Sequence, residues 1–312
     1  MKKRKSSAGS RTRSRLTSTA LAIVLGLSAH SCAYLPSGRE VEEAGVGLET
    51  LVTGLGTALR ERSGSAAADP ASGRATAPRP ARQASGAGRD FSACRGFFAG
   101  GKPPVVEPRP THRALCYDAF AILHSGESKT AVYVAQKLNR ALVENAGKER
   151  TNKFFADARL PSGERSTPAD YVGSRYDKGH MAPAGDMPTE QAMAQSFSLA
   201  NIVPQAPRHN RGVWKNSVEA ATRKYAGRAS GDVYVITGPV FVPSVAQSPA
   251  IGLGEVRVPK YLFKLVYDQE RHKAWAHWHL NDNATKGSQP ISYGELVRRT
   301  GIEFLPGIKQ DN

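Results

Sequence analysis

Short apolar runs, each bounded by glycine, proline or polar residues, recur along the last two-thirds of the chain. Their length and their flanking turn residues are typical of β-strands. They cover residues 114–123, 131–134, 233–237, 261–267 and 274–280. A further strand-like run covers residues 199–203. We therefore predict a sheet of short strands.

Helical spacing of apolar residues appears between these strands. The predicted helices cover residues 137–146, 190–197, 213–225 and 293–300. Ser292 and Glu295 form a capping-box pattern at the start of the last helix. The mixture predicts one α+β domain over residues 89–312, built on an antiparallel sheet with flanking helices.

The first 33 residues have the order of a signal peptide. Basic residues come first, the apolar run 21–27 follows, and small residues lead to Cys32. The run is short for about 30 Å of hydrocarbon, so an uncleaved membrane anchor is only the alternative. Lipidation of Cys32 is another alternative, although Ala29 stands where such signals usually have Leu. We predict an exported protein, secreted or periplasmic, with anchoring to the envelope as the alternative.

Residues 34–88 differ in composition from the rest. Ala, Gly, Ser, Pro and Arg dominate, and aromatic residues are almost absent. Such a segment buries too little apolar surface to offset its chain entropy. We predict a disordered linker between the leader and the domain.

Charge and cysteines add two constraints. The net charge is +16; residues 1–88 hold 13 Lys and Arg against 6 Asp and Glu, or +7, so the domain keeps +9. A basic domain attracts nucleic acid, heparin-like glycans or anionic membranes. Cys94 and Cys116 bracket a Pro- and Gly-rich segment, and exported thiols oxidise, which predicts a disulfide. Two unrelated buried thiols are the alternative.

The segment YDKGHMAPAGDM, from Tyr176 to Met187, carries the candidate chemistry. Gly179 before His180 allows a close backbone approach or an unusual φ, and Pro183 ends any regular strand. A lone histidine here would more often be structural. The strand-like run 199–203 and a helix headed by Asn210 follow, however, and together they predict a β-β-α unit.

These residues resemble the DNA/RNA non-specific endonucleases, which include the endonuclease G type and have a ββα-metal (His-Me finger) active site. The family pattern is Asp-Arg-Gly-His with Met-Ala-Pro, then Asn-x-x-Pro-Gln, then an Asn four residues before a Trp. This chain has DKGHMAP over Asp177–Pro183, NIVPQ over Asn201–Gln205, and Asn210 before Trp214. The resemblance extends over about residues 91–306.

The resemblance implies that His180 is the general base that activates water and that Asn210 is the one direct protein ligand of Mg²⁺, with Mn²⁺ as a substitute. Water and phosphate oxygens would complete the coordination. The metal would stabilise charge on the phosphorane and on the leaving 3′ oxygen. Asn201 would position the base or the scissile phosphate, and Arg150 would contact a phosphate oxygen; turn capping or solvation is the alternative for these two.

Two residues depart from the family pattern. Lys178 replaces the usual Arg and loses the bidentate fork onto phosphate. Glu219, which corresponds to a glutamate that holds a metal-bound water, follows Trp214 by five residues instead of four. In a regular α-helix this spacing would put Asn210 and Glu219 on opposite faces. Either Asn210 precedes the helix, or a π-bulge restores the alignment.

Basic residues surround the predicted helix and form a candidate phosphate track. They are Arg208, Arg211, Lys215, Arg223, Lys224 and Arg228. Because backbone contacts read no base sequence, such a track favours non-specific cleavage. His277 and His279 alternate with tryptophans, which favours a packed strand over a metal site.

The leading hypothesis is a metal-dependent endonuclease that acts on DNA and RNA. A basic nucleic-acid-binding protein without turnover is the alternative from another class. A phosphodiesterase or phosphatase of small nucleotides is the third hypothesis.

Overall fold

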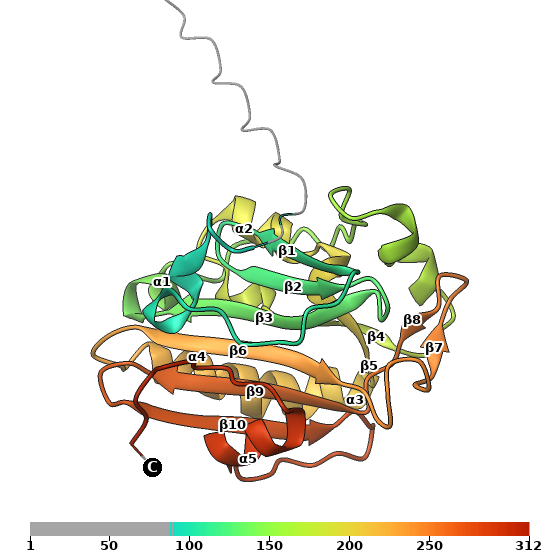
Figure 1. Cartoon of the computed structure of the whole chain (residues 1–312). Coiled ribbons are helices and arrows are strands. Elements are labelled where there is room, and N and C mark those ends of the chain that lie inside the picture. Colours follow the sequence, from blue (N-terminus) through green and yellow to red (C-terminus); the bar gives the residue numbers. More distant parts are fainter. Residues whose placement is uncertain (1–87, 89, 312) are drawn as a thin grey trace, which may run out of the picture. The chain divides into compact units, whose positions relative to one another are not determined.

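The computed structural model describes Gly88 and residues 90–311, and it confirms the α+β class and the antiparallel sheet. Seven strands form the main sheet in the order β1-β2-β3-β6-β9-β10-β11 (Figure 1). In that order their bounds are His112–Cys116, Ala121–Ser125, Thr130–Leu138, Val233–Val240, Tyr261–Asp268, Lys273–Leu280 and Ile291–Ser292. Two separate strand pairs are β4 (Asp177–His180) with β5 (Ile202–Gln205), and β7 (Ala250–Ile251) with β8 (Val256–Arg257).

Helices lie on both faces of the main sheet, with α5 on the near face and α4 on the far face in Figure 1. The α-helices are α1 (Arg140–Glu144), α2 (Glu190–Ser196), α3 (Pro207–His209), α4 (Ala220–Ala226) and α5 (Tyr293–Thr300). A π-helix, η7 (Asn210–Glu219), joins α3 to α4. Short 3-10 helices are η1 (Arg95–Phe97), η2 (Ala99–Gly101), η3 (Ser162–Glu164), η4 (Pro168–Tyr171), η5 (Ala184–Asp186) and η6 (Leu199–Asn201).

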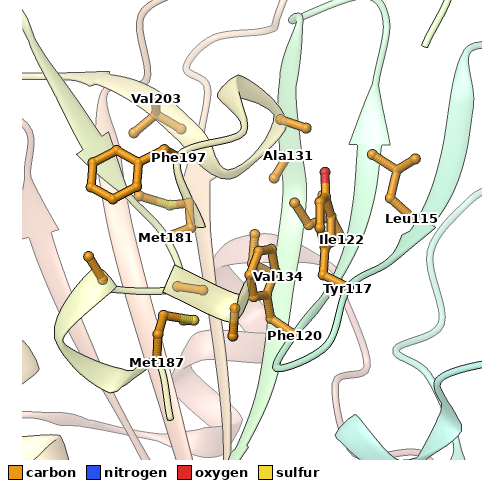
Figure 2. Close-up of a cluster of buried hydrophobic side chains, with 14 of the residues drawn as sticks. Leu115, Tyr117, Phe120, Ile122, Ala131, Val134, Met181, Met187, Phe197 and Val203 are labelled. Atoms are coloured by element: carbon orange, nitrogen blue, oxygen red, sulfur yellow. The ribbon is translucent and has the colours of Figure 1, made fainter. Parts of the chain in front are cut away.

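Alternation along the strands divides the buried side chains between two cores. Ile122 and Val134 enter one core, whereas their neighbours Ala121 and Ala135 enter the other. The first core joins the sheet to Met181, Met187 and Phe197, which come from the segment that follows β4 (Figure 2). Full burial of side chains of this size contributes about 1.5–3 kcal/mol each. The strand that ends at His180 is therefore fixed to the sheet by its own downstream residues.

Three predicted elements need correction. Residues 114–123 form a hairpin of β1 and β2 rather than one strand, because the chain turns between Cys116 and Ala121. The predicted helix 137–146 shrinks to α1, since β3 continues to Leu138 and the Asn139 side chain caps the Leu142 N–H at 3.0 Å. The run 199–203 is divided between η6 and β5.

The last helix begins and ends as predicted. The Ser292 hydroxyl accepts a hydrogen bond from the Glu295 N–H at 3.2 Å. The Glu295 carboxylate, in contrast, pairs with Arg298 and Arg299, so only half of the capping box forms. Gly301 ends the helix with φ of 69°, a conformation that glycine adopts without strain.

The Cys94–Cys116 disulfide is present, with 5.7 Å between the two Cα atoms, and it ties the segment before β1 to the end of that strand. The predicted leader 1–33 and the predicted linker 34–88, Gly88 excepted, lie outside the described residues. Within the described part of the chain, no helix is long and apolar enough to cross a bilayer.

Replacement of both Cys94 and Cys116 by Ala should lower the free energy of unfolding by about 3 kcal/mol, because the cross-link restricts the unfolded chain. Urea unfolding of the full chain measures the difference. Cys32→Ala, which leaves the cross-link in place, is the control. Equal stability of the double variant and the wild type would contradict the expectation.

Candidate active site

The pairing of β4 with β5, followed by α3, η7 and α4, forms the predicted β-β-α unit. Asp177 lies opposite Gln205 in the antiparallel register, and His180 lies opposite Ile202. His180 ends the first strand and Asn210 begins η7. The unit therefore carries a histidine at a strand end and a carboxamide at a helix start.

A cavity of about 510 Å³ lies against this unit. His180, Asn210 and Glu219 line it. Its wall also holds five cationic side chains, from Arg150, Lys178, Arg211, Lys215 and Arg223. Arg208, predicted to bind phosphate, is exposed on α3 and is not among the lining residues. A larger cavity, of about 590 Å³, is lined by other parts of the chain and contains none of the predicted site residues.

Gly179 is required by a close approach and not by an unusual φ. A Cβ atom at this position would lie 2.1 Å from the Oε1 atom of Gln205 and 2.6 Å from its Cβ atom. The Gln205 side chain occupies that space and places its Nε2 atom 3.0 Å from the Nδ1 atom of His209. The glycine of one motif and the glutamine of the next thus meet across the β4–β5 pair.

His180 is buried against aromatic rings. Its side chain is 9% exposed, and its ring lies edge-on to Phe197 with 5.1 Å between centroids. The Nε2 atom is buried and has no hydrogen-bond partner among the described residues. Burial, aided by the positive charge of Arg150, lowers the pKa of His180 to about 3. The imidazole is therefore neutral at pH 7.

Asn201 is fully buried and all of its amide groups bind backbone. Its Oδ1 atom accepts from the Ala182 N–H at 2.8 Å. Its Nδ2 atom donates to the Ala182 and Ser196 carbonyls, both at 2.9 Å. Asn201 thus holds the chain just beyond His180, and any effect on the base would pass through that loop.

Asp177 fixes the orientation of the Asn210 amide. The Nδ2 atom of Asn210 donates to the Asp177 carboxylate at 2.9 Å. Because a carboxylate only accepts hydrogen bonds, the amide nitrogen must face Asp177, and the oxygen is left for another partner. Arg211 also binds this carboxylate.

The alignment of Asn210 with Glu219 comes from a π-helix, the second of the two arrangements considered from the sequence. The ten residues from Asn210 to Glu219 form a π-helix, a helix type whose characteristic bond to the carbonyl five residues back makes its turns wider than those of an α-helix. Gly212 departs from helical geometry, with φ of −98° and ψ of −108°. The wider turns absorb the extra residue, so both side chains line the same cavity.

A buried lysine lies beneath Glu219. Lys264, in β9, is 1% exposed and donates to the Thr237 hydroxyl at 2.7 Å and to the Met181 carbonyl at 3.4 Å. Burial raises the pKa of Glu219 to about 7, and the Lys264 charge opposes that rise. Lys264 was not among the residues predicted from the sequence, although a lysine in the middle of the apolar run YLFKLVY was a usable signal.

The cavity cations have different environments. The ammonium of Lys178 lies 5.3 Å and 5.2 Å from the ring centroids of Phe154 and Tyr171, and the guanidinium of Arg150 lies 5.2 Å from that of Phe197. These are cation–π contacts, which orient the charge without neutralising it. Arg223 pairs with Asp186 at 2.7 Å. Its side chain blocks the space beside Gly185, where a Cβ would lie 2.8 Å from the guanidinium.

A metal ion would find few protein ligands here. Among residues 88 and 90–311, no three His, Cys, Asp or Glu side chains gather closely enough to hold an ion. One free amide oxygen, from Asn210, and one carboxylate on the same wall suit a hard divalent cation that keeps most of its water. The donor set therefore fits a sparse oxygen site.

His209, for which no role was predicted, is buried beside Asn210. Its Nε2 atom lies 3.2 Å from the Nδ1 atom of His279, and Trp214 packs against both rings. His279 thus belongs to the packing of η7 on β10. The alternating Trp and His residues of β10 did not indicate that His279 contacts His209, because the two histidines are 70 residues apart in the sequence.

Residues 105–311 match the family described as DNA/RNA non-specific endonuclease. This chain belongs to that family. Of its curated relatives, the mitochondrial nuclease EXOG of Xenopus laevis is 34% identical over 208 residues, covering 63% of this chain and 53% of the relative. Nuclease C1 of Cunninghamella echinulata var. echinulata is 32% identical and covers 65% of this chain and 84% of the relative. The chain spans 53–61% of the length of three EXOG relatives.

One solved structure, titled as the crystal structure of the EndoG/EndoGI complex, is similar in fold, with a TM-score of 0.55. The two chains are 25% identical, and the match covers 64% of this chain and 86% of the other.

The prediction of an exported protein, secreted or periplasmic, is wrong. The EXOG relatives and the human endonuclease G relative, 33% identical over 160 residues, are mitochondrial nucleases. The physical reason lies in the composition of the first residues, which are rich in Lys, Arg and Ser, with no acidic residue before Glu40. Mitochondrial transit segments share this composition with the basic part of a signal peptide.

Gly179→Ala should lower the free energy of unfolding by about 1–3 kcal/mol, because the added methyl group forces β4 away from Gln205. Urea unfolding measures the loss. Gly163→Ala is the matched control, since its Cβ would meet no atom within 4 Å. Equal stability of the two variants would show that Gln205 moves aside freely.

The His180 ring should stay neutral down to about pH 5 in the metal-free protein. Its folded pKa of about 3 lies below the value of about 6.5 in the unfolded chain. The folded protein then binds fewer protons over this window, so acidification below pH 6.5 also lowers the free energy of unfolding. Nitrogen NMR of labelled histidine rings, assigned with His180→Gln, follows the titration. A midpoint near pH 6.5 would contradict the burial argument.

Proposed function

We propose that this protein is a metal-dependent endonuclease that hydrolyses phosphodiester bonds of DNA and RNA with little sequence preference. The observation that carries the proposal is one cavity that holds a neutral buried His180, the free amide oxygen of Asn210 and five cationic side chains. Membership of the endonuclease family supports it.

His180 would act as the general base. A neutral imidazole at the cavity wall accepts the proton of an attacking water as the water's oxygen approaches phosphorus. Phe197 and Phe154 pack against the ring, with centroid distances of 5.1 Å and 5.7 Å, and against each other, with 4.9 Å between their centroids. Asn201 fixes the following loop, so the ring direction depends on the β4 backbone more than on side-chain freedom.

Asn210 would hold Mg²⁺ directly, and Glu219 would orient a water of the ion; Mn²⁺ is expected to substitute. When bound, the ion would stabilise negative charge on the phosphoryl oxygens and on the leaving 3′ oxygen. Asp177 keeps the Asn210 oxygen available by holding the amide nitrogen.

The cavity cations would bind the substrate through its phosphates. Arg150, Lys178, Arg211 and Lys215 each place a positive charge on the wall. Phosphate contacts position the substrate without reading bases, which accounts for low sequence preference. Lys178 supplies a point charge in place of a fork, so it would bind one phosphate oxygen at a time.

The full chain should cleave plasmid DNA and RNA with Mg²⁺ and lose activity with EDTA. His180→Ala should reduce the rate by about a hundredfold to ten-thousandfold, because a positioned base contributes that much. Gel assays measure both rates. His112→Ala, which changes a histidine of the other cavity, is the matched control.

Unchanged cleavage by His180→Ala would contradict the assignment of the base. Retained DNA binding without any cleavage by the wild type would instead favour the nucleic-acid-binding protein. Faster hydrolysis of dinucleotides than of oligonucleotides would favour a small-nucleotide phosphodiesterase.

A further inference from the structure

The helical segment that delivers Asn210 begins without a cap from its own side chains. Ala206 stands at the N-cap position of α3, and Pro207 follows it. The first N–H groups of a helix need partners from elsewhere. Here the partners come from the loop after β10, 75 residues further along the chain.

Asn281 holds the Ala206 peptide in place. Its Oδ1 atom accepts from the Ala206 N–H at 2.8 Å. Its Nδ2 atom donates to the carbonyls of Pro204 and Pro259, both at 3.0 Å, so both amide hydrogens are used. The Ala206 carbonyl in turn accepts from the Asn210 N–H at 2.9 Å. Ala206 is therefore the only residue between Asn281 and the Asn210 backbone in this chain of hydrogen bonds.

Asn283 supplies the second contact. Its Oδ1 atom accepts from the Arg208 N–H at 2.9 Å, in the first turn of α3. The loop that presents both asparagines is ordered by its own hydrogen bonds, from the Ala284 N–H to the Asp282 carboxylate at 2.7 Å and from the Thr285 hydroxyl to the Leu280 carbonyl at 2.8 Å. Asn281 and Asn283 are thus held by a loop that is stabilised by its own hydrogen bonds.

We propose that Asn281 and Asn283 are positioning residues for metal binding at Asn210. The inference rests on the proposed function. Asp177 orients the Asn210 side chain, whereas the two loop asparagines fix the backbone from which that side chain projects. A single amide ligand gives a weak site unless its position is fixed, and loss of a supporting hydrogen bond around a ligand typically reduces metal affinity about 10–100-fold.

Direct binding of Mn²⁺ to the full chain, without nucleic acid, tests the proposal by electron paramagnetic resonance. Asn210→Ala defines the signal that belongs to this site. Asn281→Ala should raise the Kd for that site about tenfold or more, and Asn283→Ala should raise it by a smaller factor. Asn283→Asp keeps an oxygen acceptor for the Arg208 N–H and should restore wild-type affinity. Asn145→Ala, which removes an exposed asparagine and its hydrogen bond at the end of α1, should leave the Kd unchanged.

Kinetics and amide exchange separate positioning from general stability. The metal concentration for half-maximal cleavage should rise in Asn281→Ala while KM for DNA stays within about twofold. Amide exchange should become faster at Ala206 and Asn210. Wild-type Mn²⁺ affinity in Asn281→Ala or in Asn283→Ala would overturn the proposal, as would failure of Asn283→Asp to restore binding.

The experiments distinguish failure of the positioning proposal from failure of the proposed function. A wild type that does not cleave, but whose Mn²⁺ binding depends on Asn281, would overturn the proposed activity and support the positioning role. If Asn281→Ala fails to fold, the Ala and Asp variants at Asn283 decide the question alone.

Discussion

The close approach of Gly179 to Gln205 is the contact on which the candidate site depends. It lets β4 and β5 pair in the register that puts His180 opposite Ile202. The same glutamine reaches His209, the residue before Asn210. A side chain at position 179 would separate the strands, and His180 and Asn210 would move relative to each other. The three motifs are thus coupled at one position, because residue 179 has no Cβ atom.

Burial acts in opposite directions on the two titratable groups of the cavity. For His180 it disfavours the proton and lowers the pKa, whereas for Glu219 it disfavours the negative charge and raises the pKa. The fixed charges reinforce one effect and oppose the other: Arg150 also lowers the pKa of His180, and Lys264 stabilises the Glu219 carboxylate. The cavity therefore holds a neutral imidazole and a carboxyl group whose ionised form is stabilised by a buried cation.

Local patterns were enough to predict several of the residues that line the cavity. Some features depend only on near neighbours in the sequence and could be predicted from it. They are the motif around His180, the strand before Asn210 and the cap of α5. The split of residues 114–123 was missed, because a hairpin and a long strand have the same apolar content. Lys264 was missed because only its burial under η7 shows its importance. The Cys94–Cys116 pair was predicted correctly from an argument about export that the mitochondrial relatives contradict; proximity, not compartment, is what the structure supports.

The sequence left two arrangements open for Asn210 and Glu219, and the structure shows the π-helix. An extra residue between Trp214 and Glu219 would rotate one side chain out of the cavity in a regular helix. Trp214 and Val218 are both buried, so the packing fixes that part of η7 against the sheet. At the other end the loop asparagines fix Ala206 and Arg208. The wider turns of the π-helix between Asn210 and Glu219 absorb the extra residue and keep both side chains on one wall of the cavity.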